Sequence, residues 1–326
     1  MYRLTKHLVL AAALLTANAA AHAQDPSANY PSNPIHIVTP FAPGATTDFL
    51  SRIIADKMNA DWKVPVVVDN RTGATGYVGA EIVAKAPPDG YTLINVVSGH
   101  VILRQFIKDM SFDSIKGFAP IILLARTPIA LVIANNVPVK DTKEFVAYAK
   151  ANPNKMGYGT SGIGSGVHLA MLQFEERAGV KLIHVPYKGG APALQDTIAG
   201  NTAVSMQGLY TATEAIRAGK VRALFNFSAK RSSLFPDLPT AEEVGYPGLV
   251  TDEWWAILAP AGTPPAIVNK LNAEIKKIFA EPDVKARIDK LGIDFVGSTP
   301  QELGAFMEKE RAKNEKLLQD AGVKLE

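Results

Sequence analysis

Two loops carry most of the residues whose types and spacing suit chemistry. The first, Pro43 to Thr47 in PFAPGATTDFL, lies between an apolar strand pattern and a helical pattern. The second is GYGTSGIGSG, from Gly157 to Gly166, followed by the helical VHLAMLQFEE. A helix that begins behind such a loop presents free backbone N–H groups, and its dipole favours a negative charge there. We therefore predict two anion-binding loops, although neither contains Lys or Arg.

Hydroxyl groups and glycines add to the anion-binding character of these loops. Thr46 and Thr47 supply hydroxyls in the first loop, and Thr160, Ser161 and Ser165 supply them in the second. Glycine lets a backbone approach a ligand closely. Each dipole or charge interaction contributes about 0.3–1 kcal/mol, so full pairing with a cation is not required. One loop from each half of the chain is suited to hold one end of a small acid.

Nucleotide motifs fit the glycine run poorly. Gly157, Gly159 and Gly162 match G-x-G-x-x-G, but the acidic residue expected about 20 positions later is missing from KLIHVPYK. Gly159 and Gly164 have P-loop spacing, but Ser165 stands where that motif requires Lys. We therefore expect no nucleotide cofactor.

Enzyme and metal signatures are also missing from the sequence. It contains no G-x-S-x-G, no H-E-x-x-H and no cysteine, and the histidines after residue 30 lack metal-ligand spacing. Trp254 and Trp255 are expected to pack in a core. We predict neither catalysis nor a metal or cofactor.

Two alternatives stay open. A periplasmic hydrolase of small esters predicts that Ser161 or Ser165 hydrogen-bonds His168, with an acidic residue orienting the imidazole. An interaction module that signals without a small ligand predicts a filled cleft.

The elements that position the first loop alternate between strand and helix patterns. This order predicts an α/β fold with a parallel sheet and helices on both faces. Strands are expected at Ile35 to Phe41, Val64 to Asp69 and Tyr91 to Val97, and helices at Asp48 to Asn59 and Gly76 to Lys85.

A second α/β set follows, and two apolar stretches bracket it. If Phe118 to Ala134 and Trp254 to Ala259 both cross between lobes, they form a hinge with a ligand cleft between the lobes. The predicted domains are residues 24–125 plus 255–326 for the first lobe and 126–254 for the second. The C-terminal helical patterns begin at Pro264, Pro282 and Pro300, which suit first-turn positions.

Residues 1–23 read as a secretory signal. Arg3 and Lys6 precede an apolar run, and Ala21-His22-Ala23 is an A-x-A cleavage site. The run of about 13 residues is shorter than the roughly 20 that a membrane span needs. We expect cleavage after Ala23 and a periplasmic location.

The charge balance argues against partners that are recognised by a long-range field. Without Arg3 and Lys6 the chain has 32 basic and 31 acidic residues. Nucleic acid and anionic membranes are therefore poor candidate partners. A small ligand recognised locally suits this composition.

Beyond the loops, the sequence resembles the Bug family of extracytoplasmic solute receptors, the TctC-type binding proteins of tripartite tricarboxylate transporters. The resemblance covers nearly the whole mature chain, in one order of blocks that includes YPSNPIHIVTPFAPGATTD, VVVDNRTGATGYVGA, YGTSGIGSGVHLA, HVPYKGGAPALQD and WWAILAPAGTPPAIVNKLN. It implies a type II periplasmic-binding fold with two doubly wound lobes, a carboxylate held between them, and a membrane permease or sensor as partner of a monomer.

The resemblance also implies which residues of the two loops contact the carboxylate. Gln207 is added because it follows a strand toward the cleft floor, and Ser98 and His100 complete the predicted set. The predicted ligand-binding set is Phe41, Ala42, Ala45, Thr46, Thr47, Asp48, Ser98, His100, Thr160, Ser161, Gly164, Ser165, His168 and Gln207. Dicarboxylates, tricarboxylates, acidic amino acids and aromatic carboxylates all fit two such loops.

Two positions depart from the family pattern or bear on the charge of the ligand. The usual P-G-G-x-x-D has Ala45 at its third position, which is strained by about 1 kcal/mol if φ is positive there. Arg104 stands where relatives often have proline and is read as a surface residue, or else as a partner for a protruding carboxylate. Asp48 would repel an anion unless it turns inward to cap its loop.

Overall fold

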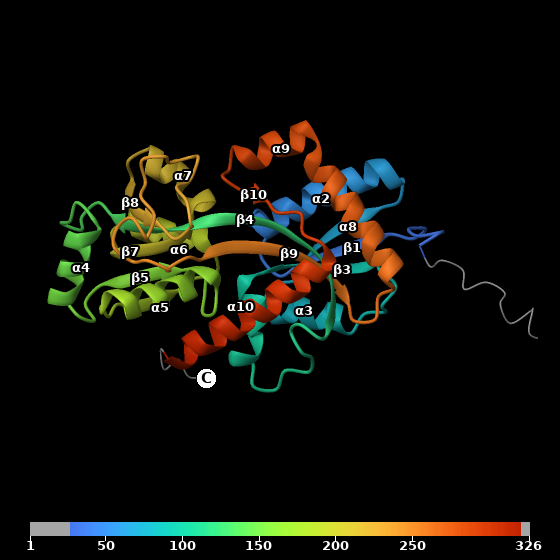
Figure 1. Ribbon diagram of the computed structural model, residues 1–326, viewed down its shortest axis with the longest axis horizontal. Coiled ribbons are helices and arrows are strands. Elements are labelled where there is room, and N and C mark those ends of the chain that lie inside the picture. The colour runs from blue at the N-terminus through green and yellow to red at the C-terminus, as the bar shows by residue number, and fades with distance from the viewer. Residues whose placement is uncertain (1–26, 321–326) are drawn as a thin grey trace, which may run out of the picture.

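The computed structural model describes residues 27–320, which form two α/β lobes arranged along the long axis of the molecule (Figure 1). The predicted signal segment 1–23 lies outside the described residues. In the described range, no helix combines the length and apolarity that a bilayer crossing demands.

The first lobe is built on a sheet in the order β2-β1-β3-β9-β4. β1 pairs in parallel with β2 and with β3, as predicted. Neighbouring residues of β1 point to opposite faces, so Ile37 and Val38 belong to different hydrophobic cores. The strands of this lobe are β1 (Ile35–Thr39), β2 (Val66–Asn70), β3 (Thr92–Val97), β9 (Asp252–Pro260) and the short β10 (Asp294–Phe295).

Helices cover both faces of this sheet. Leu50 of α2 and Leu271 of α8 pack in the core on one face, and Ala80 of α3 and Met307 of α10 pack in the core on the other. The helices are α2 (Thr46–Trp62), α3 (Tyr77–Ala84), α8 (Pro265–Ala280), α9 (Pro282–Asp289) and α10 (Pro300–Asp320), with short 3-10 segments η1 (Ala74–Gly76) and η2 (Ser98–Gln105).

The second lobe repeats the layered arrangement around β5. This strand pairs in parallel with β6 and β7, and β4 closes the sheet antiparallel to β7 and β8. The strands are β5 (Gly157–Thr160), β6 (Ile183–Pro186), β7 (Val204–Gly208) and β8 (Val221–Asn226), and the helices are α4 (Thr142–Ala151), α5 (Gly166–Ala178), α6 (Gly190–Ile198) and α7 (Leu209–Arg217). Phe174 of α5 and Phe225 of β8 lie in one core of this lobe.

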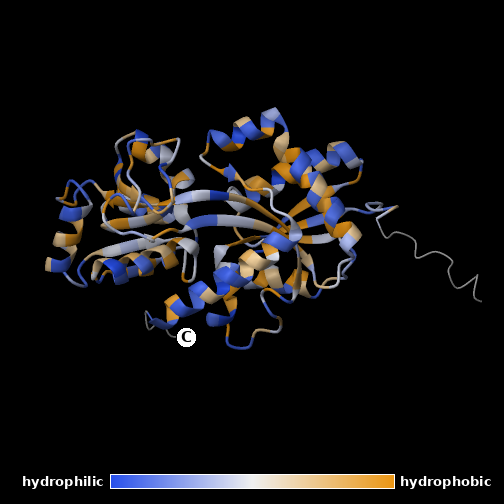
Figure 2. Cartoon of the chain, in the orientation of Figure 1, coloured by the Kyte–Doolittle hydropathy of each residue, from blue (hydrophilic) through white to orange (hydrophobic). Residues whose placement is uncertain are grey.

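The 17-residue strand β4 (Phe118–Ala134) belongs to both sheets. It pairs with β9 as far as Pro128 and with β7 from Ile129 onward. The chain returns before β9, where the Thr251 N–H donates to the Phe227 carbonyl oxygen at 2.9 Å. Figure 2 shows that β4 and β9 turn hydrophilic between the lobes, where Arg126 pairs with Trp254 and Thr127 with Glu253. The domain boundaries remain a prediction.

The sheet is mixed, because strands that cross between the lobes are added to the predicted parallel strands β1, β2 and β3. β9 runs antiparallel to both β3 and β4. The physical reason is the pair of crossings, because a chain that leaves a lobe and returns beside its own path runs in opposite directions. The helix α10 adds a further link between lobes: it packs against β4 and η2 of the first and α5 of the second, and Figure 1 shows it lying obliquely across the molecule.

Candidate functional site

The first predicted loop lies at the carboxyl end of β1 and leads into α2. Ala45 is the N-cap residue of that helix, and no side chain accepts a hydrogen bond from the helix at that position. Thr46 is half-buried and Thr47 is buried. The first-turn N–H groups of α2 therefore have no side-chain cap, which is the condition for binding an anion.

Ala45 causes no backbone strain. Its φ is −67° and ψ is 160°, an extended conformation that any residue adopts. The positive φ of this loop, 83°, falls on Gly44 instead. The change from the family's glycine at position 45 therefore carries no cost in the backbone conformation.

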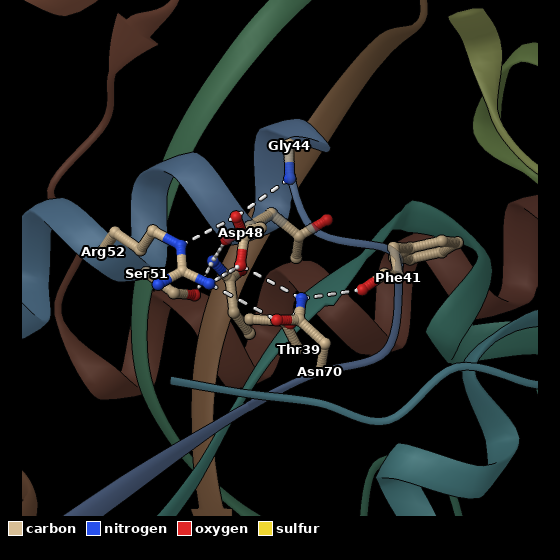
Figure 3. A network of polar contacts seen from close by, with 9 residues as sticks. Thr39, Phe41, Gly44, Asp48, Ser51, Arg52 and Asn70 are labelled. Carbon is tan, nitrogen blue, oxygen red and sulfur yellow. Dashed lines mark hydrogen bonds and ion pairs between the residues drawn. The ribbon is translucent and has the colours of Figure 1, made fainter. Parts of the chain in front are cut away.

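Asp48 is turned into the protein and tied to its own loop (Figure 3). The Gly44 N–H donates to Oδ2 at 3.0 Å, and the Arg52 guanidinium donates to both carboxylate oxygens at 2.9 Å. Burial acts to raise the pKa of Asp48, but the hydrogen bonds from Arg52, Gly44 and Asn70 together lower it. Asp48 thus caps and braces the loop, and its oxygens are already occupied by donors.

Asn70, at the end of β2, joins this loop to the neighbouring strand. Its side-chain NH₂ lies within hydrogen-bonding distance of three oxygens: Thr39 Oγ1 at 2.6 Å, the Phe41 carbonyl at 3.0 Å and Asp48 Oδ1 at 3.0 Å. Neither Asn70 nor Arg52 was among the predicted site residues. The i, i+4 spacing of Asp48 and Arg52 was a usable signal for the ion pair, but nothing local in the sequence indicated Asn70.

The second predicted loop joins β5 to α5. Ser165 is the N-cap residue of α5: its hydroxyl donates to the Gly162 carbonyl at 2.7 Å and accepts from the His168 N–H at 3.3 Å. Thr160 is fully buried, and its hydroxyl accepts from the Gly162 N–H at 3.2 Å and lies 2.7 Å from His184 Nε2. Ser161 is half-buried. Thr160 and Ser165 therefore shape the loop.

Three stacked rings lie behind this loop. The His168 and His184 rings are 4.1 Å apart and nearly parallel, and Tyr158 stacks on the other face of His184 at 4.9 Å. Burial lowers the pKa of His168 to about 3, with a contribution from His184, and burial lowers that of His184 to about 4. The Gly164 N–H donates to His168 Nδ1 at 3.1 Å, so the neutral ring carries its proton on Nε2. These histidines give the loop no positive charge at neutral pH.

Phe41, which precedes the first loop, and the glycines of the second loop both lie close to η2, which follows β3. Phe41 and His100 line a cavity of about 10 Å³ together with Pro40, Thr75, Gly76, Val96, Val97 and Leu103. On its other side η2 contacts the second loop: Ser98 Oγ lies 2.3 Å from where a Cβ on Gly166 would stand, and the Gly164 carbonyl oxygen lies 2.7 Å from where one on Gly99 would stand. Gly166 of the second lobe therefore permits this close contact with η2 of the first lobe, and a role of Gly164 in ligand binding stays a prediction.

The remaining predicted site residues differ in their exposure. Ala42 is exposed, and Gln207 is buried, with its side-chain NH₂ donating to the Gly190 carbonyl at 3.1 Å and to Ser205 Oγ. Burial lowers the pKa of His100 to about 4, and its Nε2 finds no hydrogen-bond partner in the part of the chain that the structure describes. Arg104 is exposed, as its surface reading predicts.

A larger hollow of about 440 Å³ lies on the second lobe beside the start of α4. The N-terminus of this helix is already satisfied, because Asp141 accepts from the Glu144 N–H and Glu144 accepts from the Lys140 N–H, both at 2.8 Å. Volume alone therefore does not identify an anion site here.

Within the described residues, Ser165 does not have the geometry that the hydrolase alternative requires. Ser165 is bonded to the backbone N–H of His168, whereas the imidazole Nδ1 accepts from the Gly164 N–H. Among residues 27–320 no group of histidine and acidic side chains is arranged to hold a metal ion. Trp254 and Trp255 are buried, as their core-packing interpretation predicts.

The interaction-module alternative predicts a filled cleft. The structure agrees with that prediction at one point, where Ser98 of the first lobe contacts Gly166 of the second. Known proteins separate it from the receptor interpretation. A family model described as "Tripartite tricarboxylate transporter family receptor" matches residues 50–323. Protein BugT of Bordetella pertussis is 32% identical over 298 residues, which cover 91% of each chain.

Two solved structures hold small acids in the same fold. An R. palustris protein solved with adipate is 34% identical, with a TM-score of 0.86 over 91% of this chain and 100% of its own. MatC from Rhodopseudomonas palustris with bound malate is 31% identical, with a TM-score of 0.82 over 89% and 100%. These are solute-binding receptors rather than enzymes, so the prediction that the chain is not an enzyme is confirmed. The chain belongs to the Bug-type receptors of the tripartite tricarboxylate transporter family.

Proposed function

We propose that this protein is a periplasmic receptor that captures a small organic carboxylate between its two lobes and presents it to a tripartite tricarboxylate-type permease or to a sensor. The observation that carries the proposal is the uncapped start of α2 behind β1. Phe41, just before it, lines a cavity with His100 of η2, and the second loop also contacts η2 at Gly166. Helix N-termini of this kind bind carboxylates without a cationic side chain.

The ligand class follows from the same geometry. Both loops offer N–H and hydroxyl donors, and the histidines of the second loop are neutral at neutral pH. Adipate and malate, the acids bound by two similar proteins, each carry a carboxylate at both ends. A dicarboxylate is therefore the preferred candidate, ahead of citrate-like acids, acidic amino acids and aromatic carboxylates.

Binding requires the lobes to move apart. The lobes already touch at the second loop, where Ser98 Oγ of the first lobe lies 2.3 Å from where a Cβ on Gly166 of the second would stand. An open form admits the acid, and differential affinity for the closed form then shifts the population toward closure. The closed form is the one that a permease or sensor would recognise.

Calorimetric titration with a carboxylate panel tests this proposal. The panel contains malate, adipate, citrate, glutamate and benzoate, with glucose as an uncharged control. We expect heat release and a raised melting temperature with at least one dicarboxylate, and none with glucose. If no acid in the panel changes either signal, the carboxylate assignment is wrong.

Export is tested separately by mass spectrometry of the protein recovered from the periplasm. A mature N-terminus at Gln24 is expected, because Ala21-His22-Ala23 precedes it. An intact N-terminus in a membrane fraction would contradict the signal-peptide interpretation. Size-exclusion chromatography of the same material tests the expected monomer.

A further inference from the structure

Asp48 places a buried negative charge beneath the loop that is proposed to bind an anion. Its side chain is 4% exposed, and it is the third residue of α2, within the turn whose N–H groups face the loop. A carboxylate in that position would repel an acidic ligand, and the repulsion grows as water is excluded. An anion can therefore bind at this loop only if the charge of Asp48 is neutralised while its carboxylate still braces the loop.

Arg52 supplies the compensating charge. Its Nε and Nη2 each donate to one oxygen of Asp48 at 2.9 Å, the bidentate geometry that guanidinium and carboxylate groups favour. Figure 3 shows Arg52 approaching Asp48 from the helix side, while Gly44 and Asn70 approach from the loop and from β2. The pair carries no net charge, so an anion at the loop meets N–H groups and a neutral support.

Apart from its ion pair with Asp48, Arg52 contributes little to the stability of the fold. Its side chain is 52% exposed, and its only other hydrogen bond within residues 27–320 is a long one of 3.5 Å to Asn70 Oδ1. Exposed ion pairs on one helix contribute little to folding stability. Asp48 also keeps its hydrogen bonds from the Gly44 N–H and the Asn70 side chain without Arg52.

We propose that Arg52 is a positioning residue that sets the charge specificity of the first loop: by neutralising Asp48, it lets the start of α2 accept a carboxylate, and a dicarboxylate in particular. This inference rests on the proposed carboxylate-binding function. It assigns Arg52 a role through Asp48, without contact between Arg52 and the ligand.

The experiment measures binding of malate and adipate, and of their half-amides, to the full mature protein by calorimetry. Arg52→Gln is expected to weaken binding of the dicarboxylates about tenfold, and of the half-amides about threefold or less, because the amide end can occupy the first loop. Arg52→Lys keeps the positive charge and is expected to stay within about threefold of wild type.

Two further variants separate charge from folding. Asp48→Asn combined with Arg52→Gln removes both charges, and dicarboxylate affinity is expected to return to within about threefold of wild type. Lys85→Gln breaks an exposed i, i+4 pair with Glu81 on α3 and makes the same change in net charge. Its affinity is expected to match wild type.

Each outcome decides the inference. If wild type binds a dicarboxylate and Arg52→Gln binds it equally well, the inference is overturned and the proposed function stands. Equal losses in Arg52→Gln and Arg52→Lys, or no recovery in the double variant, would show that Arg52 acts through loop geometry and overturn it as well. If wild type binds no carboxylate at all, the inference and the proposed function both fail.

Discussion

At the scale of single residues, hydroxyl side chains in the second loop have two different roles. Ser165 caps α5 and bonds within its loop, whereas Ser161 is the half-buried hydroxyl beside it. Ser165→Ala is therefore expected to lower the free energy of unfolding by about 1 kcal/mol. Ser161→Ala is expected to weaken carboxylate binding while changing stability by less than about 0.5 kcal/mol. Urea unfolding and calorimetry of both variants check the pair, and a reversed pattern would contradict the assignment.

The neutral histidine stack predicts how stability depends on pH. The pKa of His168 is lowered to about 3 in the folded protein, so between that value and about 6.5 the unfolded chain binds a proton that the folded chain does not. Stability is then fully present above pH 6.5 and falls as the solution is acidified. His168→Asn keeps an acceptor for the Gly164 N–H and removes the titration.

This variant is expected to reduce the slope of unfolding free energy against pH near pH 5 by about 1.4 kcal/mol per pH unit. Urea unfolding at pH 5, 6 and 7 measures that slope in both proteins. Parallel curves for wild type and variant would show that His168 titrates normally in the folded state.

At the scale of elements, the first loop depends on a strand distant from it in sequence. Asn70 of β2 connects Thr39, Phe41 and Asp48 through one NH₂ group. Asn70→Ala removes the side-chain donor to Thr39 Oγ1 and the Phe41 carbonyl and leaves Asp48 Oδ1 with Arg52 alone. A loss of about 1–3 kcal/mol in unfolding free energy is therefore expected, together with weaker carboxylate binding. Asn201→Ala is the matched control, because the exposed Asn201 side chain donates to Asp196 Oδ1 at 3.1 Å.

Calorimetry and urea unfolding of both asparagine variants provide the measurement. Asn201→Ala is expected to change neither quantity beyond about 0.5 kcal/mol. Equal effects of the two substitutions would mean that the hydrogen bonds of the Asn70 side chain do not organise the first loop.

At the scale of the whole molecule, the proposed closure is expected to depend on a glycine where the lobes meet. A Cβ on Gly166 would stand 2.3 Å from Ser98 Oγ of the other lobe. Gly166→Ala is therefore expected to keep the lobes apart, so that the acid no longer reduces the radius of gyration and binds about tenfold more weakly. Small-angle X-ray scattering with and without malate or adipate measures the change.

A control glycine lies in the same lobe. Gly157→Ala would place its Cβ 3.4 Å from Val185, an ordinary contact, and closure should be unaffected. Adding Ser98→Ala to Gly166→Ala removes the nearest colliding atom and is expected to restore part of the closure. Normal closure in Gly166→Ala alone would show that this contact does not limit the approach of the lobes.

Patterns local in the sequence determined the α/β fold class, the alternation of strands and helices, and the two loops behind β1 and β5. Periodicity and turn residues act over a few positions, so they can be read along the chain. Tertiary structure decided which loop residues are available to a ligand. Asp48 turned inward because Asn70, 22 positions away, is brought beside it by the pairing of β1 with β2, and Gly166 serves contact between lobes because η2 lies against it. Those partners are neighbours only after folding, since no short-range pattern records which strand ends will meet.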